Sequence, residues 1–188
     1  MDTFSAIETR KSIRRFQSKL VPREIIEKLL RLAIKAPSGK NRQPWRFVVL
    51  ENHSKAELVN IMDNVAKLYK EQNKSLGSFE LSINAISEAS VVILVFNAFS
   101  NVEKYYTHYR SLTDTQSIGA AIQTLLLAAC DFGLGTLWIC DVFYCDYEIC
   151  SWLNRQDELV AAVAIGYPNQ TPHPRPRKLL NEVVEWKS

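Results

Sequence analysis

Two clusters of cationic and hydroxyl side chains stand near opposite ends of the chain. The first covers residues 10–15 (RKSIRR) and the second covers residues 172–178 (PHPRPRK). Guanidinium groups beside a hydroxyl supply the charge-assisted donors that hold a phosphate group. If the first cluster is extended, alternation places Arg10, Ser12 and Arg14 on one side of the backbone. Either cluster alone would also fit an ordinary solvated surface, where runs of charge are common.

A third polar segment, residues 36–45 (APSGKNRQPW), follows a predicted helix and leads into a predicted strand. Ser38, Asn41 and Gln43 offer both hydrogen-bond donors and acceptors. The polar edge of a flavin alternates carbonyl and N–H groups, which such amides can match, and Gly39 lets the backbone approach a flat ring. The alternative is a plain polar loop. Together with the two phosphate-type clusters, the segment points to bound FMN and redox chemistry.

Two glycines spaced by one residue, Gly133 and Gly135, resemble part of a dinucleotide-binding fingerprint. They follow a predicted helix and precede a predicted strand, which is not the context that the fingerprint requires. A nicotinamide-binding Rossmann unit is therefore not expected. The extended backbone that follows instead offers N–H groups that can face a ring. Trp138 within it is interpreted either as a ring neighbour or as a core aromatic.

Aromatic side chains gather in a predicted surface loop. They are Tyr105, Tyr106, His108 and Tyr109. Exposed aromatics in such a loop predict a lid over a flat substrate or a contact with a partner subunit. His108 has no obvious Ser or Cys partner, so a hydrolytic triad is not predicted. Next in the chain, Asp114 is interpreted as the cap of an apolar helix, and Gln116 as a side chain that could reach a cofactor or substrate.

The composition is that of an ordinary folded protein. Of the 188 residues, 47% are hydrophobic and 23% are charged, and the net charge is only +3. Neither nucleic acid nor a membrane is therefore expected as a partner. The best apolar run, residues 89–99, is about half as long as a bilayer span. The N-terminus shows no apolar signal region, so a cytoplasmic location is the default expectation.

The length and the cysteines set two further expectations. A chain of this size is expected to form one domain over residues 1–188. The four cysteines are Cys130, Cys140, Cys145 and Cys150. Their spacing matches no zinc or CxxC motif, so free thiols and no bound metal are expected.

Hydrophobic periodicity and turn residues predict alternating helices and strands. The helices are expected over residues 2–9, from 21–24 to about 36, and over 54–75, 113–132 and 146–154. The strands are expected over residues 45–51, 90–96, 136–140 and 159–166. Residues 101–109 are expected to form a loop or a frayed helix. The chain from Tyr167 is rich in proline and should be extended, with a terminal strand over 181–186. This order favours an α/β or α+β layered domain.

Single residues set several of these boundaries. Asp2 or Thr3 is expected to cap the first helix, and Ser54, with Glu57 three residues on, the third. Gly133 is a typical residue to end the apolar helix. The apolar face of the second helix is expected to consist of Ile25, Leu29, Leu32, Ala33 and Ala36.

Four motifs in the same order resemble those of the nitroreductase family, the FMN-dependent oxidoreductases, over nearly the whole chain. Residues 10–14 (R-x-S-x-R) resemble its phosphate motif, and residues 36–45 resemble its flavin-ring motif. Residues 133–139 (GLGT followed by Trp and Ile) resemble its central motif. Residues 166–178 (GYP followed by R-x-RK) resemble its closing motif. The order of all four makes the resemblance specific.

The resemblance implies an α+β fold, a nitroreductase-like α/β sandwich in which helices flank a central, mostly antiparallel sheet. It also implies an intertwined homodimer with two FMN sites at the interface. The C-terminal segment would be exchanged onto the partner, and the apolar helix from Thr113 would be a main dimer element.

The resemblance also assigns candidate contacts. The phosphate or the polar edge of the flavin would be bound by Arg10, Lys11, Ser12 and Arg14, with Arg175 and Arg177 closing on the phosphate. The ring would be lined from the other subunit by Pro37, Ser38, Gly39 and Asn41. Further cofactor contacts are expected from Gln43, Gln116 and the backbone at Leu137, Trp138 and Ile139, near the flavin N5. Substrate contacts are expected from Tyr105, Tyr106, His108 and Tyr109.

The implied reaction is a ping-pong transfer of hydride. NADH or NADPH would reduce FMN and leave, and a small electron-poor acceptor such as a nitroaromatic or a quinone would then be reduced. No side chain is assigned as catalytic, because the flavin carries the chemistry; Lys11 or Arg14 would place positive charge beside it. Longer members carry an inserted helical region that this chain can replace only with residues 105–112, so nitro compounds are not assumed as substrates. The alternative is a flavin-binding sensor or carrier without turnover.

Overall fold

A strand buried on both faces organises the fold. The computed structural model describes residues 2–187, and all seven residues of β2 (Val91–Asn97) are buried. Its even-numbered hydrophobic residues enter one core cluster and its odd-numbered ones another, because successive side chains of a strand alternate between faces. Such a strand needs cover on both sides. The predicted buried central strand is therefore confirmed.

Four strands formed by the described residues make one sheet in the order β1, β2, β4, β3, and all neighbours are antiparallel. The other strands are β1 (Trp45–Leu50), β3 (Gly135–Ile139) and β4 (Glu158–Gly166). For each of these four strands, the predicted first and last residues differ from the observed ones by at most one position. The predicted α+β architecture with a mostly antiparallel sheet is confirmed, and β1 and β3 are its two edges.

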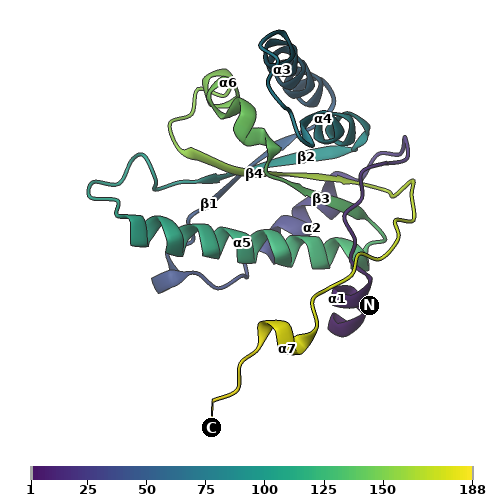
Figure 1. Ribbon diagram of the computed structural model, residues 1–188, viewed down its shortest axis with the longest axis vertical. Coiled ribbons are helices and arrows are strands. Elements are labelled where there is room, and N and C mark those ends of the chain that lie inside the picture. Colours follow the sequence, from purple (N-terminus) through teal and green to yellow (C-terminus); the bar gives the residue numbers. More distant parts are fainter. Residues whose placement is uncertain (1, 188) are drawn as a thin grey trace.

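Helices cover both faces of the sheet (Figure 1). One face carries α3 (Asn52–Glu71), α4 (Phe79–Glu88), the 3-10 helix η2 (Asp141–Cys145) and α6 (Asp146–Trp152). The other carries α2 (Arg23–Ala33) and the long α5 (His108–Asp131), against which α1 (Thr3–Thr9) also packs. No helix within residues 2–187 is long and apolar enough to cross a membrane.

The ends of two helices follow the predicted capping. The side chain of Asp2 accepts a hydrogen bond from the Ser5 N–H at 3.0 Å and starts α1. Gly133 lies just past α5 with φ +66°, a left-handed backbone that suits glycine. The start of α5 differs from the prediction: Thr107 caps it, seven residues before Asp114. The interpretation of Asp114 as a cap is therefore wrong.

Three other helical predictions need correction. Ser54 is the third residue of α3 rather than its cap; Glu51 caps the helix, and its N–H donates to the Ser54 hydroxyl at 3.2 Å. The second helix ends at Ala33 instead of near residue 36. Its buried residues are Ile26, Leu29 and Ala33, while Leu32 is 39% exposed.

Two segments were mispredicted for a common reason. The sequence pattern predicts no separate element for the ten residues of α4, because their apolar side chains run on into the apolar residues of β2. The terminal strand over residues 181–186 is not formed; Leu180–Val183 make the short helix α7 instead. In both cases the choice between helix and strand depends on packing against other elements, which the local sequence pattern does not contain.

The two ends of the chain run side by side along the β3 edge. Ser12 bridges to Thr136, and the Ile13 N–H donates to the Thr136 carbonyl at 2.9 Å. Phe16 bridges to Pro168, which follows β4. The chain then leaves the body of the protein, and residues 179–187, the C-terminal arm, project away from it (Figure 1).

Gly135 is the point where the N-terminal segment packs tightly on β3. A Cβ at Gly135 would lie 2.7 Å from Cγ1 of Ile13, itself a buried side chain. We expect Gly135→Ala to lower the free energy of unfolding by about 1–3 kcal/mol, as overpacking does, measured by urea denaturation. The control is Gly119→Ala, where the nearest atom would be 3.6 Å away; an equal loss there would contradict the close contact.

Candidate functional site

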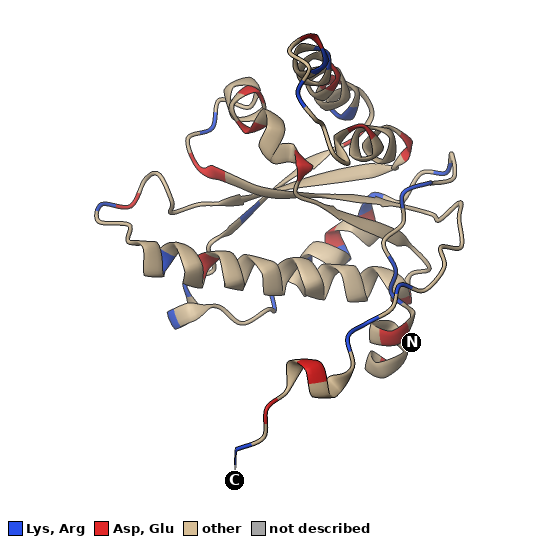
Figure 2. Cartoon of the chain, in the orientation of Figure 1, with Lys and Arg blue, Asp and Glu red and all other residues tan. Residues whose placement is uncertain are grey.

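The two basic clusters line one cavity of about 540 Å³. We call it the cationic cavity; its walls are residues 10–12 and 14 from the N-terminal segment and residues 172–177 from the C-terminal segment. Lys11 Nζ donates to the Pro172 carbonyl at 3.1 Å and so ties the two walls together. Figure 2 shows Lys and Arg residues, in blue, along both segments where they meet. The predicted convergence of the two clusters therefore occurs within one chain.

The charge of the cationic cavity is not neutralised by carboxylates of residues 2–187. Its charged lining residues are Arg10, Lys11, Arg14, Arg175 and Arg177, and no acidic residue joins them. None of these arginines forms an ion pair with an Asp or Glu of the described residues. Arg15, by contrast, pairs with Glu88 at 2.7 Å. Like charges held close together repel, so a bound anion would stabilise this arrangement.

The predicted ring-binding residues form a strained loop, residues 38–43, which we call the ring-edge loop. Lys40, Asn41 and Gln43 all have left-handed backbones, with φ of 52°, 54° and 50°. Each such residue costs of order 1–3 kcal/mol, and strain of this kind gathers at functional sites. The loop is closed by the Gln43 N–H, which donates to the Ser38 hydroxyl at 3.0 Å. The side chains of Asn41 and Gln43 are exposed and face solvent.

Gly39 fixes the ring-edge loop on α5. A Cβ at this position would overlap Cγ2 of Thr113, so a larger residue would require that side chain to shift. The Gly39 N–H donates to the Ser117 hydroxyl at 3.3 Å. The close approach that the sequence predicts for Gly39 is thus made to α5 of the same chain, while its contact with a ring stays a prediction. Gln116 is exposed on the same stretch of α5, and Pro37 is exposed just before the loop.

The ring-edge loop and the cationic cavity lie at opposite ends of α5. Gly39 meets Thr113 near the start of the helix, whereas Arg10 and Lys11 line a second cavity with Cys130 at its end. At 1.5 Å per residue, these two points of the helix are about 25 Å apart. One mononucleotide cannot span that distance, so a single chain does not bring the two groups of predicted residues onto one cofactor.

The β3 edge offers backbone groups rather than side chains. Leu137 and Ile139 are 5% and 2% exposed and belong to the core, whereas Trp138 is 37% exposed. Since the Thr136 carbonyl faces the N-terminal segment and directions alternate along a strand, the N–H and C=O of Trp138 face the same outer edge. No strand of the described residues continues the sheet there.

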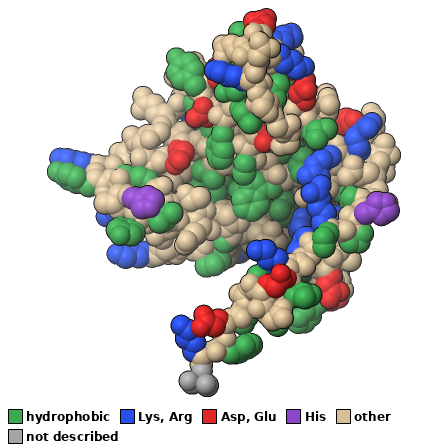
Figure 3. All heavy atoms as spheres, in the orientation of Figure 1, with side chains coloured by type: hydrophobic (Ala, Val, Ile, Leu, Met, Phe, Trp, Pro, Cys, Tyr) green, Lys and Arg blue, Asp and Glu red, His purple; other side chains and the backbone are tan. Residues whose placement is uncertain are grey.

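A hydrophobic area lies beside the row of Lys and Arg side chains on one face of the molecule (Figure 3). The exposed aromatic side chain of β3 is Trp138, which lies on the side of the sheet that α5 covers. An apolar surface next to concentrated positive charge suits a ligand with a flat ring and an anionic tail.

The aromatic residues divide into an exposed and an inward-facing group. Tyr105 and Tyr109 are 78% and 79% exposed, and His108 and Tyr109 belong to the first turn of α5 rather than to a loop. Tyr106 instead points inward, and its hydroxyl accepts from Asn97 Nδ2 at 2.7 Å. A cavity of about 230 Å³, which we call the loop cavity, joins the two regions; it is lined by Gly39, Lys40, Arg42, Tyr109, Arg110, Thr113 and Asp114.

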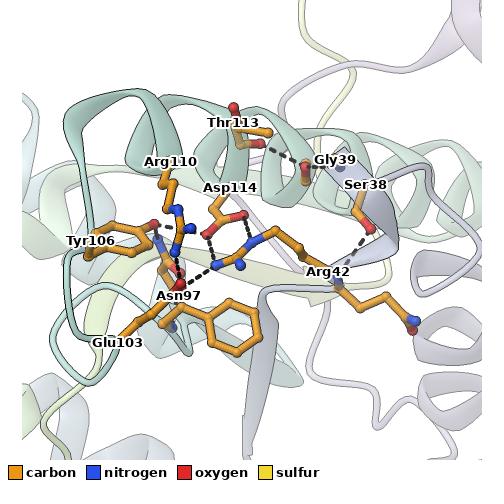
Figure 4. A network of polar contacts seen from close by, with 12 residues as sticks. Ser38, Gly39, Arg42, Asn97, Glu103, Tyr106, Arg110, Thr113 and Asp114 are labelled. Carbon is orange, nitrogen blue, oxygen red and sulfur yellow. Dashed lines mark hydrogen bonds and ion pairs between the residues drawn. The ribbon is translucent and has the colours of Figure 1, made fainter.

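An ion-pair network that no sequence motif indicates connects these regions (Figure 4). Arg42 reaches from the ring-edge loop to Asp114, which is fully buried on α5. Hydrogen bonding to Asp114 raises the pKa of Arg42, and burial raises the pKa of the Tyr106 hydroxyl. The sequence contains one signal for this network. Asp114 is an acidic residue within an otherwise apolar helix, and a buried carboxylate requires a partner.

Burial raises the pKa of all four cysteines, which disfavours the nucleophilic thiolate form. All four are free thiols, as predicted. Burial raises the pKa of Cys145 to about 12, and burial also raises the pKa of the more exposed Cys140. Within residues 2–187, no group of three or more His, Cys, Asp or Glu side chains could hold a metal ion.

Comparison with known sequences identifies related proteins. A sequence model of the Nitroreductase family matches residues 7–167. A protein of Methanothermobacter thermautotrophicus with the provisional name NADH dehydrogenase/NAD(P)H nitroreductase is 32% identical over 138 residues, 73% of this chain and 60% of that protein. The chain thus spans less than two thirds of that relative. The iodotyrosine deiodinase of Thermotoga neapolitana is 28% identical over 191 residues, 96% of this chain and 95% of that protein.

Solved structures share the fold. A provisionally named nitroreductase from Desulfovibrio desulfuricans, in complex with FMN, is 28% identical with a TM-score of 0.78, over 100% of this chain and 98% of that one. The FMN- and NADPH-dependent nitroreductase of Sphigopyxis sp. strain HMH reaches a TM-score of 0.82 over 100% of both chains, at 17% identity. At that identity the likeness shows the fold alone. Because the family model covers most of the residues that build the sheet and both helical layers, the chain belongs to the nitroreductase family.

Proposed function

We propose that this protein is an FMN-dependent oxidoreductase that uses NADH or NADPH to reduce a small electron-poor acceptor, such as a nitroaromatic or a quinone. The observation that carries the proposal is the cationic cavity. Two segments from opposite ends of the chain bring five cationic side chains together without a neutralising carboxylate among residues 2–187. A phosphate monoester is the ligand that such a site fits.

The residues present fit FMN in each of its parts. Arg10, Arg14, Arg175 and Arg177 would hold the phosphate, and the Ser12 hydroxyl lies among them. The Trp138 backbone N–H faces the outer edge of β3, where no strand of residues 2–187 pairs with it, and would meet a ring atom there. The amides of Asn41 and Gln43 are exposed and match the donors and acceptors of the pyrimidine edge. When bound, FMN supplies the two-electron carrier between the nicotinamide and the acceptor.

The side chains of this protein would bind and orient the cofactor and the acceptor rather than transfer protons. No Ser, Cys or His lines the cationic cavity with a partner that would activate it as a nucleophile. The cations at the cavity would bind the cofactor and favour negative charge on it. The aromatic side chains of Tyr105 and Tyr109, both highly exposed, would cover a flat acceptor.

We further propose a homodimer in which each FMN contacts both chains. The separation of about 25 Å along α5 between the ring-edge loop and the cationic cavity supports this, because two chains could bring the groups together where one cannot. The exposed apolar side chains of the C-terminal arm support it too: Leu179, Leu180 and Trp186 are 68%, 69% and 87% exposed. Within residues 2–187 the outer edge of β1 is also unpaired and could receive an arm from the partner.

The proposal is tested with the purified protein. We expect flavin absorbance bands, release of FMN rather than FAD on denaturation, and NADPH or NADH oxidation that depends on added acceptor. A protein that binds FMN but oxidises NADPH no faster than free FMN would be a sensor or carrier instead. A protein that binds no FMN at micromolar concentrations would contradict the proposal.

Reductive dehalogenation is the second candidate, favoured by the iodotyrosine deiodinases among the relatives. The same assay distinguishes it when the acceptor panel contains a nitroaromatic, a quinone and an iodinated phenol such as 3-iodotyrosine. Release of iodide at a kcat/KM above that for the other acceptors would assign the protein to this activity.

A further inference from the structure

The ring-edge loop, α5 and the aromatic segment (residues 101–112) meet at Arg42, which contacts both Asp114 and Glu103 (Figure 4). We propose that Arg42 and Asp114 are positioning residues. Together with Tyr106 and Glu103 they form a latch, which holds the ring-edge loop and the aromatic segment in a fixed arrangement. The inference rests on the proposed function where it names FMN and the acceptor. The latch itself is a property of this chain alone.

Both oxygens of Asp114 are engaged by this contact. Arg42 Nε donates to Oδ1 and Arg42 Nη2 donates to Oδ2, each at 3.1 Å. Asp114 is 0% exposed and the Arg42 side chain 24% exposed, so water screens the pair little. A buried carboxylate without its partner would be costly. The position of Arg42, and with it the ring-edge loop, is therefore dictated by α5.

The same carboxylate also holds the aromatic segment. The Tyr106 hydroxyl donates to Asp114 Oδ2 at 3.1 Å and accepts from Asn97, which is fully buried at the end of β2. Arg42 Nη2 also donates to Glu103 Oε2 at 2.5 Å, and Arg110 pairs with Glu103. The ring-edge loop and the aromatic segment thus share one buried carboxylate, that of Asp114.

The ring-edge loop needs such an anchor because of its strain. Arg42 lies between Asn41 and Gln43, whose left-handed backbones are disfavoured for residues with side chains. A loop with unfavourable backbone angles relaxes unless its surroundings hold it. Asn41 and Gln43 carry the amides predicted to contact the flavin. Loss of the latch is therefore expected to alter the positions of these side chains before it unfolds the protein.

The chain offers a closely matched control pair. Arg155 forms two hydrogen bonds to Asp157, with side chains 27% and 11% exposed. Its guanidinium lies 4.5 Å from the Phe96 ring, just as that of Arg42 lies 4.5 Å from the Phe99 ring. Arg155 contributes to neither the ring-edge loop nor the loop cavity. If substitution of Arg42 acts only by weakening a paired Arg–Asp contact, the same substitution at Arg155 should have the same effect.

The first test compares Arg42→Lys with Arg155→Lys by amide hydrogen exchange without cofactor. Lysine keeps the charge beside Asp114 but cannot form the paired hydrogen bonds or stack as a guanidinium does. For Arg42→Lys we expect exchange at least about tenfold faster at the amides of residues 39–43 and across 103–112, with little change in Tm. Arg155→Lys should leave both segments as in the wild type. Equal exchange in the two variants would overturn the latch.

The second test measures binding and turnover. We expect Arg42→Lys to raise the Kd for FMN about tenfold. Tyr106→Phe should raise the same Kd by a smaller factor and also raise the acceptor KM, with little change in kcat. Because both residues act through Asp114, the double variant should raise the FMN Kd less than the product of the single effects. Independent, multiplying effects would overturn the coupling. If the wild type binds no FMN, the proposed function fails while hydrogen exchange still decides the latch.

Discussion

Replacing Arg10 and Arg177 together with alanine is expected to give a folded protein that purifies colourless, without FMN. The two arginines come from opposite walls of the cationic cavity. A hydrogen bond to a charged group contributes roughly 1.5–3 kcal/mol, so losing two should raise the Kd for FMN by about a thousandfold. The check is the flavin absorbance of the purified variant, followed by titration with FMN.

The control for this variant is Arg15→Ala. Arg15 belongs to the same basic cluster but pairs with Glu88 instead of lining the cavity. We expect Arg15→Ala to keep FMN at wild-type occupancy, so a loss of colour there would point to a nonspecific effect of basic charge. A double variant of Arg10 and Arg177 that stays yellow at full occupancy would contradict a phosphate-binding role for the cationic cavity.

Removing the chain after Lys178 is expected to convert the proposed dimer to a monomer and to abolish FMN binding. The arm removed carries Leu179, Leu180, Val183 and Trp186, each more than half exposed in the isolated chain. Burying a large apolar side chain contributes about 1.5–3 kcal/mol. Loss of four such side chains should therefore weaken the association so much that the dimer dissociates at micromolar concentration. Light scattering with size-exclusion chromatography gives the mass, and FMN titration gives the affinity.

The arm also offers an internal control for this truncation. Lys187 is exposed in the same segment and pairs only with Glu185 among the residues that the structure describes. Lys187→Ala should keep both the dimer and the cofactor, whereas Trp186→Ala should weaken them. A truncated protein that stays dimeric, or a monomer that still binds FMN tightly, would show that the arm does not exchange between subunits.

The predictability of the candidate site differed between its parts. Arg10, Ser12 and Arg14 could be recognised because guanidinium and hydroxyl groups at alternate positions have a chemical meaning of their own. The side-chain roles of Leu137 and Ile139 could not be judged, because only the sheet shows that they face the core. The role of Arg42 is not visible in the sequence for a different reason. Its function depends on Asp114, which is far away in sequence and which the helical pattern had placed at a cap.

Local chemistry in the sequence determined which segments could bind a phosphorylated ring: two basic clusters, an amide-bearing loop and a strand buried on both faces. Short-range terms such as periodicity, capping and turn preference are enough for that, since they act between residues close in the chain. The tertiary structure alone decided which segments meet. It joined residues 10–14 to 172–177, set the ring-edge loop about 25 Å away along α5, and buried Asp114 against Arg42. Such pairings depend on the packing of whole layers against the sheet, a long-range effect that no stretch of sequence contains.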